Sequence, residues 1–112
     1  RPIGGFQAVQ HRLADHAVRV RGMVLTVIDA AAQLASGAPG AGRVVALAEL
    51  SVASGATHIL HDLVQVSGGI GFTWEHGLHL YERRAHHDAR LAGNPRAASR
   101  RLAEIEGWAD GA

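Results

Sequence analysis

Apolar residues recur at helical spacing through the first third of the chain. Between Phe6 and Ser36 they stand three or four residues apart, which keeps one face of a helix apolar for about eight turns. The stripe consists of Val9, Leu13, Ala17, Val20, Val24, Val27, Ala31 and Leu34. Gly37 and Pro39 follow it, an order typical of a helix end. The pattern predicts one long helix over residues 6–36.

A second apolar arc predicts a helix from about Gly42 to Val66. Its middle is slim, because Ser51, Ser54, Gly55 and Ala56 are all small. Glycine inside a helix costs about 1 kcal/mol relative to alanine. We therefore expect Gly55 to mark a place where another helix approaches closely. Glycine-rich residues 68–71 end this helix.

Two shorter helices follow. Thr73 is a plausible N-cap for the third, and Asn94-Pro95 is a cap residue followed by the residue best tolerated at the first helical position. Strand alternation, internal repeats and domain linkers are absent from the sequence. The expected fold is all-α, a single domain over residues 1–112 forming an up-and-down four-helix bundle. Because two short helices cannot cover two long ones, another chain or a missing segment is expected to complete it.

Composition narrows the functional classes. The 112 residues are 47% hydrophobic and 19% charged, which is typical of a globular chain, and the lack of cysteine excludes disulfides and cysteine-based metal sites. A net charge of +1, with arginine pairs that lack interleaved aromatic residues, argues against nucleic acid as a partner. The apolar stretches look too short and too often interrupted by charge to span a membrane. We expect a soluble, intracellular protein.

The glycine-rich junction over residues 65–72 has two interpretations. It is either a tight interhelical turn in which glycines supply positive φ, or a stretch of bare backbone against which a ligand lies. It is not a dinucleotide-fold fingerprint, because no strand precedes it and the glycine spacing differs. Residue types alone do not choose between the two.

Two motifs resemble a known family. The run QVSGGIGFTWEHGLHLYERRA, residues 65–85, and the run RPIGGFQAVQHRLAD, residues 1–15, resemble recurrent motifs in the carboxy-terminal helical domain of acyl-CoA dehydrogenases, in their expected order and spacing. The form common in actinobacteria is especially similar. The resemblance is good to about residue 92 and looser beyond it. Family members are flavoproteins about three times this length, so the resemblance implies a truncated or separately encoded piece of that domain.

The resemblance implies a share in a FAD site. In the family this domain lends groups to the FAD bound by a neighbouring subunit, and the matching positions here are Gln7, Gln65, Val66, Ser67, Gly68 and Gly69. Ser67 departs from the family, which often has histidine or an aromatic residue there. Arg83 matches a recurrent arginine, which we expect to be structural and to pair with a carboxylate. Homo- or hetero-oligomers with acyl-CoA dehydrogenase-like chains are implied as partners.

The family's catalytic carboxylate has no match in this chain. Members oxidise an acyl-CoA by removing an α-proton with a glutamate while a hydride leaves to the flavin. At the position of that glutamate in many members this chain has Ala92, followed by Gly93. Other members hold the base on a helix outside this chain, and some heteromeric subunits lack it. No catalytic residue is therefore assigned. The alternative function is a non-catalytic helical dimerisation module that has lost flavin, and a lyase or reductase on the same scaffold is a third.

Histidines form two further patterns. His58 with His61, and His76 with His79, have a spacing that can hold a metal, but no cysteine or acidic residue clearly completes a ligand set. We therefore expect no metal site. The run His86-His87-Asp88 suggests a general base, yet adjacent helical positions face different directions, which favours a solvated face.

Overall fold

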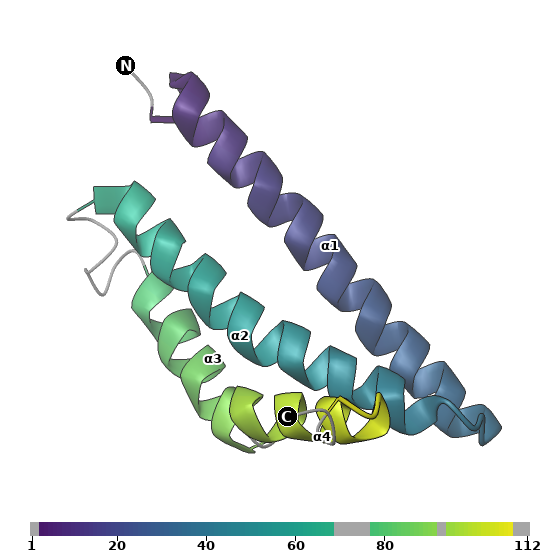
Figure 1. Ribbon diagram of the computed structural model, residues 1–112. Helices are drawn as coiled ribbons and strands as arrows, with labels where there is room; N and C mark the ends of the chain where they lie inside the picture. Colours follow the sequence, from purple (N-terminus) through teal and green to yellow (C-terminus); the bar gives the residue numbers. More distant parts are fainter. Residues whose placement is uncertain (1–2, 69–76, 92–93, 109–112) are drawn as a thin grey trace.

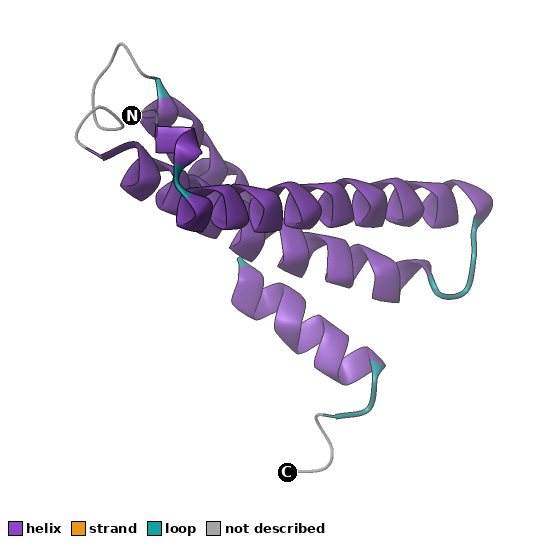
Figure 2. Cartoon of the chain, turned by 90° about the horizontal axis from the view of Figure 1, so that it is seen from above, coloured by secondary structure: helices purple, strands orange, loops and turns teal. Residues whose placement is uncertain are grey.

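Four helices and one short 3-10 turn make up the described part of the protein. The computed structural model describes residues 3–68, 77–91 and 94–108. The order is η1 (Ile3–Gly5), α1 (Gln7–Ser36), α2 (Ala41–Ser67), α3 (Leu78–Leu91) and α4 (Pro95–Ile105). No strand occurs among these residues, as Figure 2 also shows. The predicted all-α fold and its two long and two shorter helices are confirmed.

Local sequence signals set the helix ends. Gly37 has a φ of 68°, and the Gly37 and Ala38 amides donate to the carbonyls of Leu34 (3.2 Å) and Gln33 (3.0 Å), which closes α1 with a Schellman motif. At α4 the side chain of Asn94 accepts a bond from the amide of Ala97 at 2.9 Å, as its sequence predicted. The predicted start of the third helix, after Thr73, lies outside the described residues.

Helix α2 is the centre of the fold. α1 runs antiparallel to it on one side and α3 lies along its other side, while α4 contacts α2 near the turn that joins α1 to α2 (Figure 1). The buried apolar residues come mainly from α2 and α4: Ala41, Ala46, Ala48, Ile59, Val64, Ala98 and Leu102. Two interhelical ion pairs, Arg43–Glu106 and Arg101–Glu49, also join these two parts of the chain. Figure 2 shows the carboxy-terminal helix set at an angle to the long pair.

α1 and α2 approach each other closely where Gly55 was expected to allow it. A Cβ atom built on Gly55 would lie 2.8 Å from the Sδ atom of Met23 on α1, which is far inside an ordinary contact. A larger residue in place of Gly55 would therefore force the methionine aside. The prediction of close packing at this glycine is confirmed.

Much of the apolar stripe of α1 is uncovered. The buried residues of α1 are His16 and Ala30, whereas Val20, Val24, Val27 and Leu34 are exposed, Leu34 by 59%. These valines and Leu34 line shallow apolar grooves with α2 residues such as Val45 and Val52. Three helices packed on α2 leave one flank of α1 without cover, as the helix lengths predicted.

The length and hydropathy of α2 contradict one expectation from the sequence. With 27 residues and a mean hydropathy of 1.3 over its most apolar window, it is long and apolar enough to cross a membrane by length and composition alone. The expectation that the apolar stretches are too short for this was therefore wrong for α2. Mostly buried core helices of soluble proteins pass the same test; α2 contacts α1, α3 and α4, and 22% of its most apolar window is buried.

Candidate functional site

The predicted cofactor contacts gather at one end of the long helices. Gln7 is the first residue of α1 and Gln65 lies in the last turn of α2. Because α1 and α2 are antiparallel, these two residues share the end of the pair that lies opposite the Gly37 turn (Figure 1). Both glutamines are exposed, and Val66 and Ser67 are half-buried. Two amide side chains, each with donors and an acceptor, are thus available to a ligand at this end.

Gly68 gives α2 an ending that few other residues could adopt. Its φ of 63° and ψ of −147° lie in a region of backbone space that is essentially confined to glycine. Its amide donates to the carbonyl of Gln65, so this N–H group is already used within the chain. A Cβ atom built on Gly68 would meet no heavy atom of the described residues within 4 Å. No described residue therefore covers the backbone at Gly68, as a ligand lying against it would require. Gly69 lies outside the described residues.

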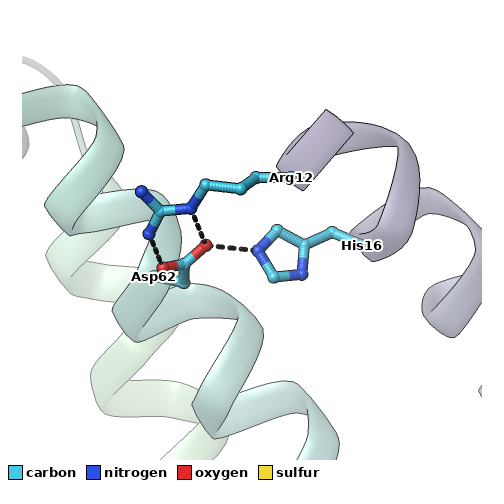
Figure 3. A network of polar contacts seen from close by, with 3 residues as sticks. All are labelled: Arg12, His16 and Asp62. Atoms are coloured by element: carbon cyan, nitrogen blue, oxygen red, sulfur yellow. Dashed lines mark hydrogen bonds and ion pairs between the residues drawn. The ribbon is translucent and has the colours of Figure 1, made fainter. Parts of the chain in front are cut away.

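A polar network joins the two helices next to this end. Arg12 and His16 on α1 both bind the carboxylate of Asp62 on α2 (Figure 3). The Arg12 guanidinium donates through Nε to Oδ2 at 3.3 Å and through Nη2 to Oδ1, and His16 Nε2 lies 2.5 Å from Oδ2. Hydrogen bonds from Arg12, then from His16, hold the pKa of Asp62 below its ordinary value of 3.8, although partial burial opposes them. Asp62 is therefore ionised at neutral pH and matched by a fixed cation.

His16 is buried deeply for a polar residue. It is 9% exposed, its Nδ1 atom has no hydrogen-bond partner among the described residues, and its ring meets that of His58 edge-on, with centroids 6.5 Å apart. The sequence analysis assigned no role to Arg12, His16 or Asp62. One signal was present, since Arg12 and His16 stand four residues apart on one side of a helix. No sequence signal identified Asp62, 46 residues further on, as their partner.

The residues at this end fit a nucleotide cofactor such as FAD. Gln65 offers polar groups suited to an adenosine portion, and the open backbone at Gly68 leaves room for ribose or pyrophosphate. A carboxylate this close would repel a pyrophosphate if it were unpaired. Arg12 largely neutralises the charge of Asp62, which removes that obstacle.

Other predicted residues are less involved. Arg83 is exposed and forms no ion pair within the described residues, so its expected pairing with a carboxylate stays a prediction; its neighbour Arg84 pairs with Asp88 at 2.8 Å. His86 and His87 are exposed, as a solvated face requires. No group of three or more metal-ligating side chains occurs in the described part of the chain. Ala92 and Gly93 lie outside it.

Comparisons with known proteins agree with the motifs. The family model described as "Acyl-CoA dehydrogenase, C-terminal domain" matches residues 1–104. Two similar relatives, both named acyl-CoA dehydrogenase IpdE2, come from Mycolicibacterium smegmatis (42% identical over 102 residues) and Mycobacterium tuberculosis (41% over 108 residues). Acyl-CoA dehydrogenase FadE34 from Mycobacterium tuberculosis is 40% identical over 87 residues, covering 77% of this chain and 12% of that protein.

These alignments cover most of this chain and a minor part of the relatives. The two IpdE2 alignments span 91% and 96% of this chain but 31% and 32% of the relatives, so the chain corresponds to about a third of their length. No solved structure matches the chain.

Proposed function

The chain belongs to the acyl-CoA dehydrogenase family, and we propose that it acts as a carboxy-terminal domain that contributes helices to an oligomer and one part of a shared FAD site. The activity of the complete assembly is the α,β-oxidation of an acyl-CoA thioester. Membership follows from a family match over 104 of the 112 residues. The role in the FAD site is our inference from the end of the helix pair that carries Gln7 and Gln65.

One observation carries the FAD proposal: α2 ends at Gly68, a glycine with positive φ that no described residue covers, three residues after the exposed side chain of Gln65. Nothing in the described chain occupies the space in front of Gly68, and Gln65 is exposed beside it. When bound, FAD supplies the hydride acceptor for the oxidation. The chain's own residues would hold it: Gln65 and Gln7 would offer hydrogen bonds to the adenosine portion, and the backbone at Gly68 would accommodate ribose or pyrophosphate.

The proton-abstracting group comes from elsewhere in the assembly. Alanine has no group that takes a proton, and Ala92 stands where many family members have the glutamate. Asp62 does not replace it, because its carboxylate is bound by Arg12 and His16 and its pKa is lowered. A base with a depressed pKa and two fixed donors is a poor acceptor for an α-proton. We therefore assign the catalytic base to a partner chain or to another segment.

The uncovered flank of α1 supports assembly with an acyl-CoA dehydrogenase-like chain. Val20, Val24, Val27 and Leu34 form a continuous exposed apolar strip, and such strips on globular proteins mark interaction surfaces. The occupant is a helix of a like or a related chain, in a homo- or hetero-oligomer. We place the assembly in the bacterial cytoplasm, without a membrane or nucleic-acid partner.

Flavin retention tests the proposal. The chain is purified alone and together with any full-length acyl-CoA dehydrogenase-like chain encoded beside it, and flavin absorbance is recorded. We expect the pair to hold FAD and Gln65→Ala to weaken this binding. Gln33→Ala, which changes a glutamine at the opposite end of α1, serves as the matched control and should leave it unchanged. A pair that assembles without flavin would contradict the FAD role and favour the dimerisation module.

A further inference from the structure

Asp62 lies near the end of the helix pair that carries Gln7 and Gln65. It precedes Gln65 by three residues on α2, and Arg12 follows Gln7 by five residues on α1, so the network is within about two turns of both glutamines. Among the described residues, the ion pairs that join α1 to α2 are both made by Asp62. No other charged link between the described parts of these helices sets their spacing at this end.

The geometry of the network restrains motion in more than one direction. The guanidinium of Arg12 reaches both carboxylate oxygens, and such a fork fixes orientation as well as distance. His16 binds Oδ2 from one turn further along α1 and is held in place by its burial. Two donors a turn apart on α1, meeting one short side chain on α2, oppose both sliding and rotation of the helices.

From this geometry we infer that Asp62 is a positioning residue: through Arg12 and His16 it holds the ends of α1 and α2 that carry Gln7 and Gln65 at a fixed spacing, and the affinity for FAD depends on this spacing. The inference rests on the proposed function, because it assumes that FAD binds at this end. The inference goes beyond the proposed function because it assigns a contribution to FAD affinity to a residue that does not touch the cofactor.

Three variants separate position from charge and from general stability. Asp62→Asn removes the charge, whereas Asp62→Glu keeps the charge and moves the carboxylate by one methylene. Glu106→Gln is the matched control, since Arg43–Glu106 is also an interhelical ion pair of similar exposure but lies at the far end of α2. The reciprocal double variant Arg12→Asp with Asp62→Arg restores the link with reversed polarity. Arg12→Gln, at a half-exposed side chain, tests the same link if Asp62→Asn does not fold.

Two readouts are taken on the chain assembled with its acyl-CoA dehydrogenase-like partner. The Kd for FAD is measured by flavin fluorescence. The distance between α1 and α2 is measured with spin labels on cysteines introduced at exposed His11 and His61, which is practical because the chain has no cysteine of its own. We expect Asp62→Asn and Asp62→Glu to raise the Kd about tenfold and to broaden the distance distribution. Glu106→Gln should change neither, and the double variant should recover most of the affinity.

The outcomes distinguish this inference from the function on which it rests. If the unaltered complex binds no FAD, the proposed function fails and the inference falls with it. If the complex binds FAD but the Asp62 variants keep its affinity, the inference is wrong and the proposed function stands. Wild-type affinity in Asp62→Glu with a loss in Asp62→Asn would show that Asp62 acts through its charge and would overturn the inference. An affinity loss without a change in distance would show that Asp62 does not act by positioning the helices and would also overturn it.

Discussion

Gly55 offers a direct test of how closely α1 and α2 pack. Replacing a glycine inside a helix by alanine stabilises the helix by about 0.8–1.0 kcal/mol when nothing opposes it. Here the new Cβ atom would lie 2.8 Å from Met23 Sδ, so the thioether must move by about 0.6 Å to reach an ordinary contact distance of 3.4 Å. Overpacking of this kind costs about 1 kcal/mol or more, and the flexible methionine keeps the cost at the lower end. We therefore expect Gly55→Ala to change the free energy of unfolding by less than about 0.5 kcal/mol.

A double-mutant cycle isolates the clash. In a Met23→Ala background nothing opposes the new methyl group, so Gly55→Ala should stabilise the chain by about 1 kcal/mol, giving a coupling of about 1 kcal/mol. Urea unfolding followed by far-UV circular dichroism measures each free energy. Gly22→Ala is the control: a Cβ at this mid-helix position of α1 meets no heavy atom within 4 Å, so it should stabilise both backgrounds alike. Equal effects of Gly55→Ala in the two backgrounds would refute the close approach.

Three further predictions concern the acid response, a helix cap and the exposed strip. The lowered pKa of Asp62 contributes stability that is complete above its ordinary value of 3.8 and is lost as the pH falls below it. The difference in urea midpoint between wild type and Asp62→Asn should therefore be smaller at about pH 3 than at about pH 6. An equal difference at the two pH values would contradict this. Asn94→Ala should cost about 1 kcal/mol in the unfolding free energy, since it removes the bond to the Ala97 amide, and Asn94→Ser should cost much less. Val24→Gln with Val27→Gln should leave the chain's thermal midpoint nearly unchanged but weaken assembly with its partner in sedimentation experiments; unaltered assembly would place the partner elsewhere.

Local signals in the sequence predicted most of the fold. Helix ends were predictable because Gly37 and Asn94 act on their own neighbouring backbone, and helix extent followed from apolar spacing. The close approach of α1 and α2 at Gly55 was also predictable locally, from the run of small residues around this glycine. What covers each face was harder to predict, because periodicity shows that a stripe is apolar without showing what packs on it. The strip through Val24 and Val27 is thus regular in sequence yet exposed in the chain.

The candidate site, too, could be predicted only in part from the sequence. The resemblance placed Gln7 and Gln65, and the antiparallel packing of their helices brings both to one end of the pair. The link between Asp62 and the pair Arg12 and His16 joins positions 46 and 50 residues apart, and only the register of two packed helices brings them together. Within the described residues the ion pair in this part of α3 is made by Arg84 with Asp88, and the predicted carboxylate partner of Arg83 stays a prediction.

Hydrogen exchange tests the central claim, that FAD lies against the end of α2, most directly. Amide exchange is followed by mass spectrometry in the complex of the chain with its acyl-CoA dehydrogenase-like partner, with and without FAD. We predict that FAD slows exchange in the peptide that contains Gln65 to Gly68 and leaves the peptide around Gly37, at the opposite end of the helix pair, unchanged. If the complex retains flavin but exchange at Gln65 to Gly68 is unaltered, the cofactor is bound elsewhere and the claim is wrong.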